Sequence, residues 1–449
     1  MDSSRSGSRP RDHSAPSCRY HFSQNGCRYG EACRFSHDTP DSRPHGRKNQ
    51  GNRGHHFSSR EFRSTARQAG DARAGRSEPQ NHHIHTRHQK ISVMSYNVLA
   101  DAYANKHRQE LYTRIPVACL SWQNRVELLA QEIAYWSPTV LCLQEVDHFA
   151  DLEKKLAVHG YVGRFLQRTN DRPDGLAMFW KASVFGDAPV AVEEVMFAGH
   201  NLRDNVAQVY RLRMTKNADG VAVEEAPLEV VVSNIHVLFN PKRGDIKLGQ
   251  VRVLMDLIAK ESQDSLLPVI MCGDWNSAPF SGVYDFVSNG RLDFMERDRR
   301  TVSGQIAGNR ARSVNNSGTG SSTLYKAPKP WKMEEIATAM GDPTLAFGAD
   351  MPSTAVLSHD LDLTSSYRHV LGSEPQFTTA HDKYIGTVDY IFFSSQKTGQ
   401  GDRRQSWHIE PHTVLLPPPT SAILPHGLPR GWFGSDHVSL LVNFSCVFR

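Results

Sequence analysis

Polar side chains follow several apolar runs of this 449-residue chain, at points where a buried strand would end. Residues 268–272 are continuously apolar and stop at Gly273 and Asp274, with Asn276 shortly after. Because α/β proteins place their chemistry at the carboxyl ends of such strands, a carboxylate and an amide at this edge could share a phosphate or a metal-bound water. Other polar side chains next to apolar runs are Asn97, Glu145, His236, Asp389, Asp436 and His437. Gly-Asp after a single strand is usually only a turn, so the prediction rests on the whole set.

For some of these residues a purely structural role is a sufficient explanation, and for others it is not. Glu145 emerges where the apolar run 139–143 stops, and its oxygens suit a hard cation such as Mg²⁺. Taken alone, Asn97 is better explained as a turn former, and His236 as a satisfied core histidine. Asp389 lies near the start of an apolar strand, where an unpaired carboxylate is costly, so we expect His437 to be its partner.

A second set of residues with metal-binding chemistry lies near the N-terminus. Cys18, Cys27, Cys33 and His37 have the spacing C-x8-C-x5-C-x3-H. Three thiolates and one imidazole form a closed tetrahedral set, which holds zinc structurally and leaves no open position for catalysis. Because the segment 12–39 is too short to bury a core, we expect Zn²⁺ binding to supply its folding free energy.

This segment resembles the Cys3His (CCCH-type) zinc fingers that bind single-stranded RNA. In that family, aromatic side chains stack on bases beside basic groups. The resemblance implies RNA-binding roles for Tyr20, Phe22, Tyr29, Phe35, Arg28 and Arg34. The same aromatics could instead pack around the zinc. Residues 14–17 lack the basic-aromatic lead-in of the AU-rich-element readers, so the resemblance does not extend to RNA sequence specificity.

Charge and cysteine usage separate this head from the rest of the chain. Residues 1–90 hold 17 Lys and Arg against 8 Asp and Glu, whereas the whole chain has a net charge of only +5. Residues 40–88 are rich in Arg, Ser, Gly and His, which predicts a disordered basic linker that either meets a polyanion or merely solvates the chain. The other four cysteines are scattered like reduced thiols, and neither a signal peptide nor a membrane-length apolar run is seen. We expect an intracellular protein, cytoplasmic, nuclear or both, without membrane association.

Residues 89–449 show the strand and helix patterns of a large α/β domain. Alternating or continuous apolar sequence predicts strands at 91–97, 139–143, 175–180, 209–214, 228–236, 268–272, 387–393 and 440–448. Helical spacing of apolar residues predicts helices over 122–136, 149–156 and 248–258. The Gly/Ser/Asn-rich stretch within 296–370 predicts a flexible insertion without chemistry.

The ordered polar set resembles the endonuclease/exonuclease/phosphatase superfamily along residues 91–449. Three phrases are similar to the carbon-catabolite-repressor type deadenylases, nocturnin and Angel proteins: SYNVLA at 95–100, CLQEV at 142–146 and SDH at 435–437. NPKRGDIKL at 240–248 is most similar to the Angel branch. The resemblance implies an α/β fold of the four-layer sandwich type, with two mixed β-sheets face to face and helices outside.

The resemblance also implies a metal site and an activated water. It makes Glu145 the Mg²⁺ ligand, assisted by Asn97, with Asp436 as a further candidate ligand. Asp274 then orients or deprotonates the attacking water.

Four residues are assigned to the phosphate in the same way. Asn276 and His236 would hold the scissile phosphate. Asp389 would orient His437, which would contact a phosphate oxygen as negative charge builds in the transition state.

Three functions remain open on the sequence alone. The leading hypothesis is a Mg²⁺-dependent 3′–5′ exoribonuclease of the deadenylase type, which trims mRNA 3′ ends and is recruited to RNA by its zinc finger. The Angel-like phrases favour a second hypothesis, an RNA 2′,3′-cyclic phosphatase. A third is an RNA-binding adaptor whose catalytic body has become silent. The chain lacks the leucine-rich repeats by which repressor-type deadenylases join their large complex, so protein partners are not predicted.

Overall fold

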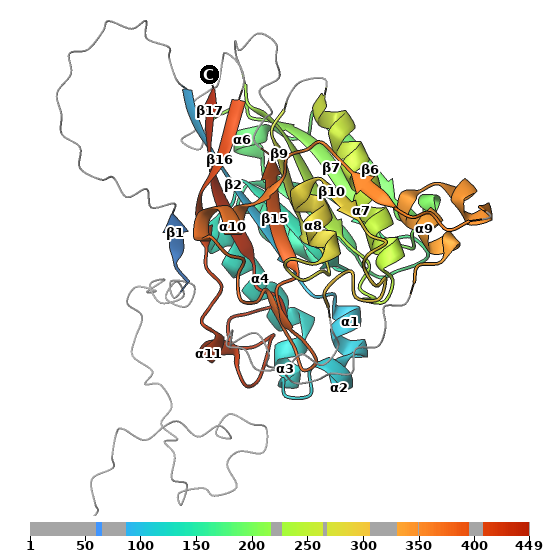
Figure 1. Ribbon diagram of the computed structural model, residues 1–449. Coiled ribbons are helices and arrows are strands. Elements are labelled where there is room, and N and C mark those ends of the chain that lie inside the picture. Colours follow the sequence, from blue (N-terminus) through green and yellow to red (C-terminus); the bar gives the residue numbers. More distant parts are fainter. Residues whose placement is uncertain are drawn as a thin grey trace, which may run out of the picture. The chain divides into compact units, whose positions relative to one another are not determined.

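Two mixed β-sheets form the centre of the protein (Figure 1). The computed structural model describes residues 60–64, 87–216, 227–263, 267–305, 330–348, 350–394 and 407–448. All of these lie in one compact unit, Gly54–Arg449. The first sheet has the strand order β1-β16-β17-β2-β3-β5-β4, and the second has the order β12-β15-β9-β8-β7-β6.

The central strands β9 and β15 of the second sheet are buried along their whole length, whereas the edge strands β1 and β6 are mostly exposed. Those of the first sheet are β1 Phe62–Ser64, β2 Arg87–Asn97, β3 Val140–Val146, β4 Tyr161–Gln167, β5 Gly175–Lys181, β16 Trp407–Leu415 and β17 Leu440–Phe448. Those of the second are β6 Ala191–Met196, β7 Val206–Arg213, β8 Glu229–His236, β9 Val269–Asp274, β12 Thr364–Ser365 and β15 Asp389–Ser394. Two small ribbons add β10 Arg291–Asp293 with β11 Val356–Ser358, and β13 Thr379–Ala380 with β14 Ile385–Gly386.

Helices connect the strands and cover the sheets. The α-helices are α1 Asp101–Lys106, α2 Arg108–Leu111, α3 Val117–Leu120, α4 Trp122–Trp136, α5 Phe149–Ala157, α6 Ala182–Phe185, α7 Gly244–Gln263, α8 Gly282–Asn289, α9 Met333–Met340, α10 Ser366–Leu371 and α11 Thr420–Ile423. The described residues also include the 3-10 helices η3 Phe197–His200 and η4 Pro343–Phe347. The predicted helix 122–136 coincides with α4, and its apolar stripe is buried as its spacing requires.

Because side chains alternate between the two faces of each strand, the sheets form three apolar cores. One lies between the sheets, and one lies on the outer face of each sheet. One face of β9 places Ile270 in the core between the sheets, and the other places Met271 against the outer helices. On the first sheet, Leu141 of β3 packs outward against Leu129 of α4, whereas Val140 points between the sheets. The predicted four-layer arrangement of two mixed sheets flanked by helices is therefore confirmed for the described residues.

A buried polar link joins the two sheets inside this apolar core. The Nδ2 of Asn234 on β8 donates to the carbonyls of Leu143 at 3.0 Å and Ala177 at 3.2 Å, and to Gln208 Oε1 at 3.2 Å. Its Oδ1 accepts from Gln144 Nε2 at 2.8 Å. Asn234, Gln144 and Gln208 are all fully buried, so these bonds have no exposed water to replace them. The link fixes β8 of the second sheet against β3 and β5 of the first, and β8 and β3 carry His236 and Glu145 of the polar set.

Asn234→Leu will lower the free energy of unfolding by about 3 kcal/mol, because several buried polar groups lose their partner at once. Urea denaturation followed by tryptophan fluorescence measures this change. The control is Asn289→Ala at the exposed end of α8, for which we expect a change within about 0.5 kcal/mol. Equal stabilities for the two variants would contradict the structural role of the link.

One of the predicted domain features differs from the structure. Residues 60–64 fall in the predicted disordered linker 40–88, but β1 pairs antiparallel with β16, so the prediction is wrong for this segment. The flexible insertion is predicted for the Gly/Ser/Asn-rich stretch Gly304 to Ser322 within 296–370, and this stays a prediction. The described helix α9 follows that stretch, and its apolar residues Ile336 and Ala339 pack into the core on α7. Residues 306–329 lie outside the described part. Within the described ranges, no helix has the length and apolar character needed to cross a membrane.

Candidate active site

The ends of five strands bring the predicted polar residues to one edge of the two sheets. In the second sheet, the parallel pairing of β8 with β9 sets His236 opposite Asp274, and the antiparallel pairing of β15 sets Asp389 on the other side of Asp274. In the first sheet, β2 ends at Asn97, and Glu145 lies near the end of its neighbour β3. Since the sheets pack face to face, all of these tips meet at one end of the sandwich.

Asn97 lies between the two carboxylates at the centre of this site. Its Nδ2 donates to Glu145 Oε1 at 3.1 Å and to Asp274 Oδ2 at 3.0 Å. Its Oδ1 accepts from the backbone N–H of Leu99. The other oxygen of Glu145, Oε2, accepts from the backbone N–H of Ala100 at 3.2 Å. Asn97 is thus a donor to both carboxylates in this structure, and its role as a metal ligand stays a prediction.

A bulge in β3 aims Glu145 into the site. The pairing of β3 with β5 shifts register between Leu143 and Val146, and Glu145 has a φ of 55° in the left-handed region. Such a backbone costs on the order of 1 kcal/mol for a non-glycine residue, and the surrounding sheet must hold it in place. The sequence CLQEV contains no glycine or proline that signals this turn.

Asp389 and His437 form a buried pair beside Asp274. His437 Nδ1 lies 2.8 Å from Asp389 Oδ2, and His437 Nε2 lies 3.9 Å from Asp274 Oδ2. Burial opposes the charged imidazole, but the nearby charges of Asp389, Asp436 and Asp274 raise the pKa of His437 well above its usual value. The expectation that Asp389 has His437 as its partner is confirmed.

His236 differs from His437 in its charge environment. Its Nε2 lies 3.5 Å from Asp274 Oδ2, and its Nδ1 is buried without a hydrogen-bond partner among the described residues. Burial and the positive charge of Arg168 lower the pKa of His236 well below its usual value. The site therefore contains one imidazole that favours the charged form and one that favours the neutral form.

The two central carboxyl groups, those of Glu145 and Asp274, have raised pKa values. Burial, together with the charges of Asp174 and Asp436, raises the pKa of Glu145 to about 8. Burial and the charge of Asp389 raise the pKa of Asp274 to about 7. One donor atom each from Glu145, His236 and Asp274 lie within 4.8 Å of one another. Oxygen-rich donors at this separation, with raised carboxyl pKa values, fit a divalent cation, which would stabilise both charges.

The loop after β9 is held by a buried lysine that the sequence analysis missed. Lys247 Nζ donates to the backbone oxygen of Asn276 at 2.6 Å, and burial lowers the pKa of Lys247 to about 7. Asn276 has a φ of 45°, its backbone N–H donates to Asp274 Oδ1 at 2.9 Å, and its Nδ2 donates to the carbonyl of Val237 at 2.9 Å. Both the carboxylate of Asp274 and the amide of Asn276 are therefore fixed in direction. A lysine on the buried stripe of α7 is the one signal that could have revealed this contact.

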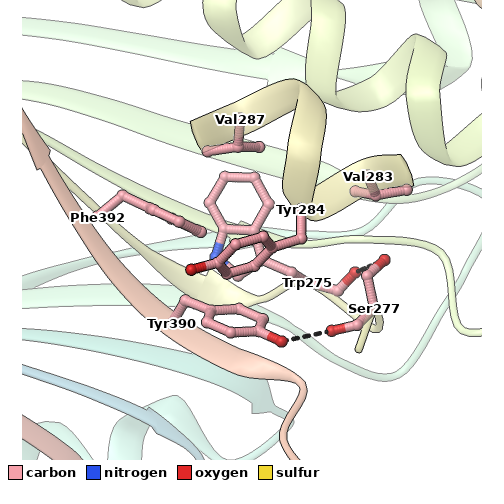
Figure 2. Close-up of a pocket in the computed structure, with 7 residues that line it drawn as sticks. All are labelled: Trp275, Ser277, Val283, Tyr284, Val287, Tyr390 and Phe392. Carbon is pink, nitrogen blue, oxygen red and sulfur yellow. Dashed lines mark hydrogen bonds between the residues drawn. The ribbon is translucent and has the colours of Figure 1, made fainter. Parts of the chain in front are cut away.

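An aromatic cluster supports the same loop from behind. Trp275, Tyr284, Tyr390 and Phe392 pack together under Val283 and Val287 of α8 (Figure 2). The hydroxyl of Tyr390 donates to the backbone oxygen of Ser277 at 2.9 Å. This rigid packing keeps the turn that follows Asp274 in place.

Asp436 faces the site from another direction. Its Oδ2 accepts from the hydroxyl of Tyr112 at 2.9 Å, and its negative charge contributes to the raised pKa of Glu145. It does not belong to either group of donors within 4.8 Å of one another among the described residues. Its predicted role as a Mg²⁺ ligand stays a prediction, and in this structure it is a hydrogen-bond acceptor of Tyr112.

Three further residues next to Glu145 were not predicted from the sequence. Asp174, immediately before β5, accepts from Tyr103 at 2.8 Å and pairs with Arg168 at 3.2 Å. Asp174 is fully buried, and its charge acts on Glu145. Asp274 was predicted because it is a polar residue next to an apolar run. Asp174 directly precedes the apolar run 175–180, so the same pattern could have revealed it.

The predicted zinc ligands and RNA-binding residues all lie outside the described residues. The ligands are Cys18, Cys27, Cys33 and His37, and the RNA-binding candidates are Tyr20, Phe22, Arg28, Tyr29, Arg34 and Phe35. Both assignments therefore remain predictions.

The chain is similar to known proteins in sequence and in fold. Residues 94–437 match the endonuclease/exonuclease/phosphatase family. The chain belongs to this family. Carbon catabolite repressor protein 4 homolog 3 of Arabidopsis thaliana is 35% identical over 369 residues, which are 79% of this chain and 75% of that protein. Protein angel homolog 2 of Bos taurus is 31% identical over 385 residues, 79% of this chain and 69% of that protein.

Solved structures agree with the assignment to the family. The crystal structure of ANGEL2, a 2′,3′-cyclic phosphatase, matches with a TM-score of 0.63 and 27% identity, covering 86% of this chain and 97% of that chain. The same protein in complex with adenosine-2′,3′-vanadate matches with a TM-score of 0.62 and 28% identity, covering 86% and 98%. The predicted family and its repressor and Angel group are thus confirmed, and the chain is a hydrolytic enzyme of the nuclease and phosphatase type.

Proposed function

We propose that this family member is a Mg²⁺-dependent phosphodiesterase that acts on the 3′ ends of RNA. The observation that carries the proposal is the convergence of Glu145, Asp274 and His437 from separate strand ends into one buried site. Their chemistry is complementary to a phosphodiester: carboxylates for a cation and a water, and an imidazole for a phosphate oxygen.

In this proposal, Asp274 acts on the attacking water. One of its oxygens accepts from the backbone N–H of Asn276, and the other accepts from Asn97. These bonds fix the direction of the carboxylate, as proton transfer from a positioned water requires. A bound Mg²⁺ held by Glu145 would polarise the phosphate oxygen and lower the pKa of that water.

In the same proposal, His437 acts on the phosphate. Asp389 holds its Nδ1, which leaves Nε2 free to donate toward a phosphate oxygen near Asp274. The charged imidazole would then stabilise the additional negative charge of the transition state. His236 and Asn276, on the other side of Asp274, would complete the phosphate contacts.

Two reactions at an RNA 3′ end fit this site. In a 3′–5′ exoribonuclease the terminal linkage is cut and a nucleotide leaves, which shortens tails such as poly(A). In a 2′,3′-cyclic phosphatase the cyclic phosphodiester at the end is opened and removed, and the RNA keeps its length. The similarity to ANGEL2, a 2′,3′-cyclic phosphatase, favours the second reaction. We further propose that the N-terminal segment binds Zn²⁺ and single-stranded RNA and that the protein works in the cytoplasm, the nucleus or both.

Two 5′-labelled oligoadenylates, one with a 3′-hydroxyl and one with a 2′,3′-cyclic phosphate, will distinguish these reactions. With Mg²⁺ we expect either a ladder that shortens from the 3′ end or the loss of the cyclic phosphate at constant length, as measured on denaturing gels with end-group analysis. Removing the metal with EDTA will lower the rate by at least about 100-fold, and excess Mg²⁺ will restore it, because Glu145 and Asp274 lose their counter-charge.

Matched controls separate the alternatives. A DNA oligonucleotide of the same length tests whether the 2′-hydroxyl is required, and Glu145→Gln should match the chelated enzyme. If neither RNA is turned over at high enzyme concentration, the proposal is rejected. The result would then favour the hypothesis of an RNA-binding adaptor with a silent catalytic body. Turnover that is unchanged by EDTA would reject the metal site alone.

A further inference from the structure

Arg60 lies far from the catalytic residues in sequence yet is buried in the catalytic domain. It is only 5% exposed, and it precedes the residues 94–437 that match the family. Its guanidinium makes four hydrogen bonds: to Leu416 O at 2.9 Å, Glu132 Oε1 at 2.8 Å, Ser439 Oγ at 2.7 Å and Ser439 O at 2.6 Å. An arginine with this many buried acceptors is held in one position.

Glu132 would be a buried, unpaired charge without Arg60. It lies on α4, is fully buried, and has Arg60 as its ion-pair partner. Its Oε1 also accepts from the hydroxyl of Ser439 at 2.7 Å. Because an isolated buried carboxylate is costly, the helix and Ser439 depend on the arginine. The three residues thus form one closed cluster that spans the N-terminal segment, α4 and the chain just before β17.

The cluster of Arg60, Glu132 and Ser439 is connected to the active site by a short segment of the chain. Ser439 follows His437 by two residues, and both precede β17, which begins at Leu440. The backbone N–H of His437 donates to Ser435 Oγ, whose hydroxyl donates to the backbone oxygen of Asn97. The segment 435–439 is therefore anchored at one end by Ser435 to β2 and at the other end by Ser439 to Arg60.

The residues after Arg60 add a second attachment. β1 extends the first sheet by pairing with β16, and Leu416 N–H donates to Glu61 O at 2.8 Å. Phe62 packs edge-on against Trp136 of α4, with 5.4 Å between ring centroids. Backbone pairing and an aromatic contact at the same place indicate a defined docking site for this segment.

We propose that residues 60–64 are part of the catalytic unit and that Arg60 is a positioning residue, which fixes His437 through Ser439. The proposal rests on the proposed function only for its kinetic readout. Without Arg60, Ser439 loses two of its hydrogen bonds, and His437 gains freedom to leave the phosphate-facing position. Misplacement of a catalytic group by a fraction of an ångström is enough to slow turnover.

Three variants of the full chain test the proposal: Arg60→Met, Arg60→Lys and the control Arg63→Met, which changes an exposed arginine of β1. On whichever RNA the wild type consumes, we expect Arg60→Met to lower kcat about tenfold with KM within about twofold, because the substrate contacts remain. Arg60→Lys keeps the charge but loses the planar fork of donors. Its kcat should therefore lie between that of the wild type and that of Arg60→Met. Arg63→Met should behave like the wild type.

Hydrogen–deuterium exchange supplies a readout that needs no activity. We expect faster exchange of the backbone amides at 435–441 in Arg60→Met, with unchanged exchange in β8 and β9. A lowered melting temperature with kcat within twofold of wild type and unchanged exchange at 435–441 would overturn the proposal and leave Arg60 a stability residue. If Arg60→Met fails to fold, Arg60→Lys decides by the same two measurements. If the wild type consumes no RNA, the exchange result still decides the anchoring.

Discussion

Asp274→Asn will lower kcat for RNA hydrolysis by about 10³-fold while KM changes little. The amide keeps the size of the side chain and can still accept from the backbone N–H of Asn276, but it cannot take a proton from water. It also removes a negative charge next to the cation site, which adds to the loss. Single-turnover rates with saturating Mg²⁺ and labelled oligoadenylate measure the effect.

The matched control for this variant is Asp187→Asn, which changes an exposed aspartate between α6 and β6. It should retain full activity. Circular dichroism should show both variants folded, because Asp274 lies at a strand end whose pairing does not need its side chain. An Asp274→Asn enzyme with more than about a tenth of the wild-type kcat would show that another group activates the water.

Asp389→Asn will lower kcat by about 10²-fold to 10³-fold, because His437 loses the carboxylate that holds its Nδ1 at 2.8 Å. The neutral amide neither stabilises the charged imidazole nor keeps its ring in one tautomer. His437→Ala should cost at least as much, since it removes the phosphate contact itself. A double-mutant cycle compares the wild type, the two single variants and the double variant. The measurement is kcat of each enzyme under the same conditions.

The cycle distinguishes a working pair from two independent residues. If Asp389 acts only through His437, the double variant will be no slower than His437→Ala. Fully multiplicative losses would contradict this and give Asp389 a separate role. One such role would be its charge effect on Asp274, whose pKa it helps to raise.

Much of the fold follows from local patterns in the sequence. The run 268–272 and the stripe of 122–136 coincide with β9 and α4, because burial of a continuous apolar run or of one helix face leaves few alternatives. The alternation that sends Ile270 inward and Met271 outward is also a property of a strand itself. The same patterns placed Asp274 and Glu145 at strand ends, and the ordered polar set indicated the family that the relatives confirm.

Other features depend on contacts between distant segments and leave no local signal. Residues 60–64 read as basic linker, yet Arg60 is buried because Glu132 and Ser439, 72 and 379 residues away, supply its partners. The helix α9 lies in a segment next to Gly/Ser/Asn-rich sequence, and only its packing on α7 orders it.

The sequence by itself predicted which residues would carry the chemistry and that each lies where an apolar strand ends or begins. The tertiary structure decided their directions: the bulge that turns Glu145, the lysine that holds Asn276, and the hydrogen bonds of Asn97 to both carboxylates. Periodicity reports the burial of a side chain, which is a local preference. The direction of a polar group is set by partners that the chain brings together only when the two sheets pack.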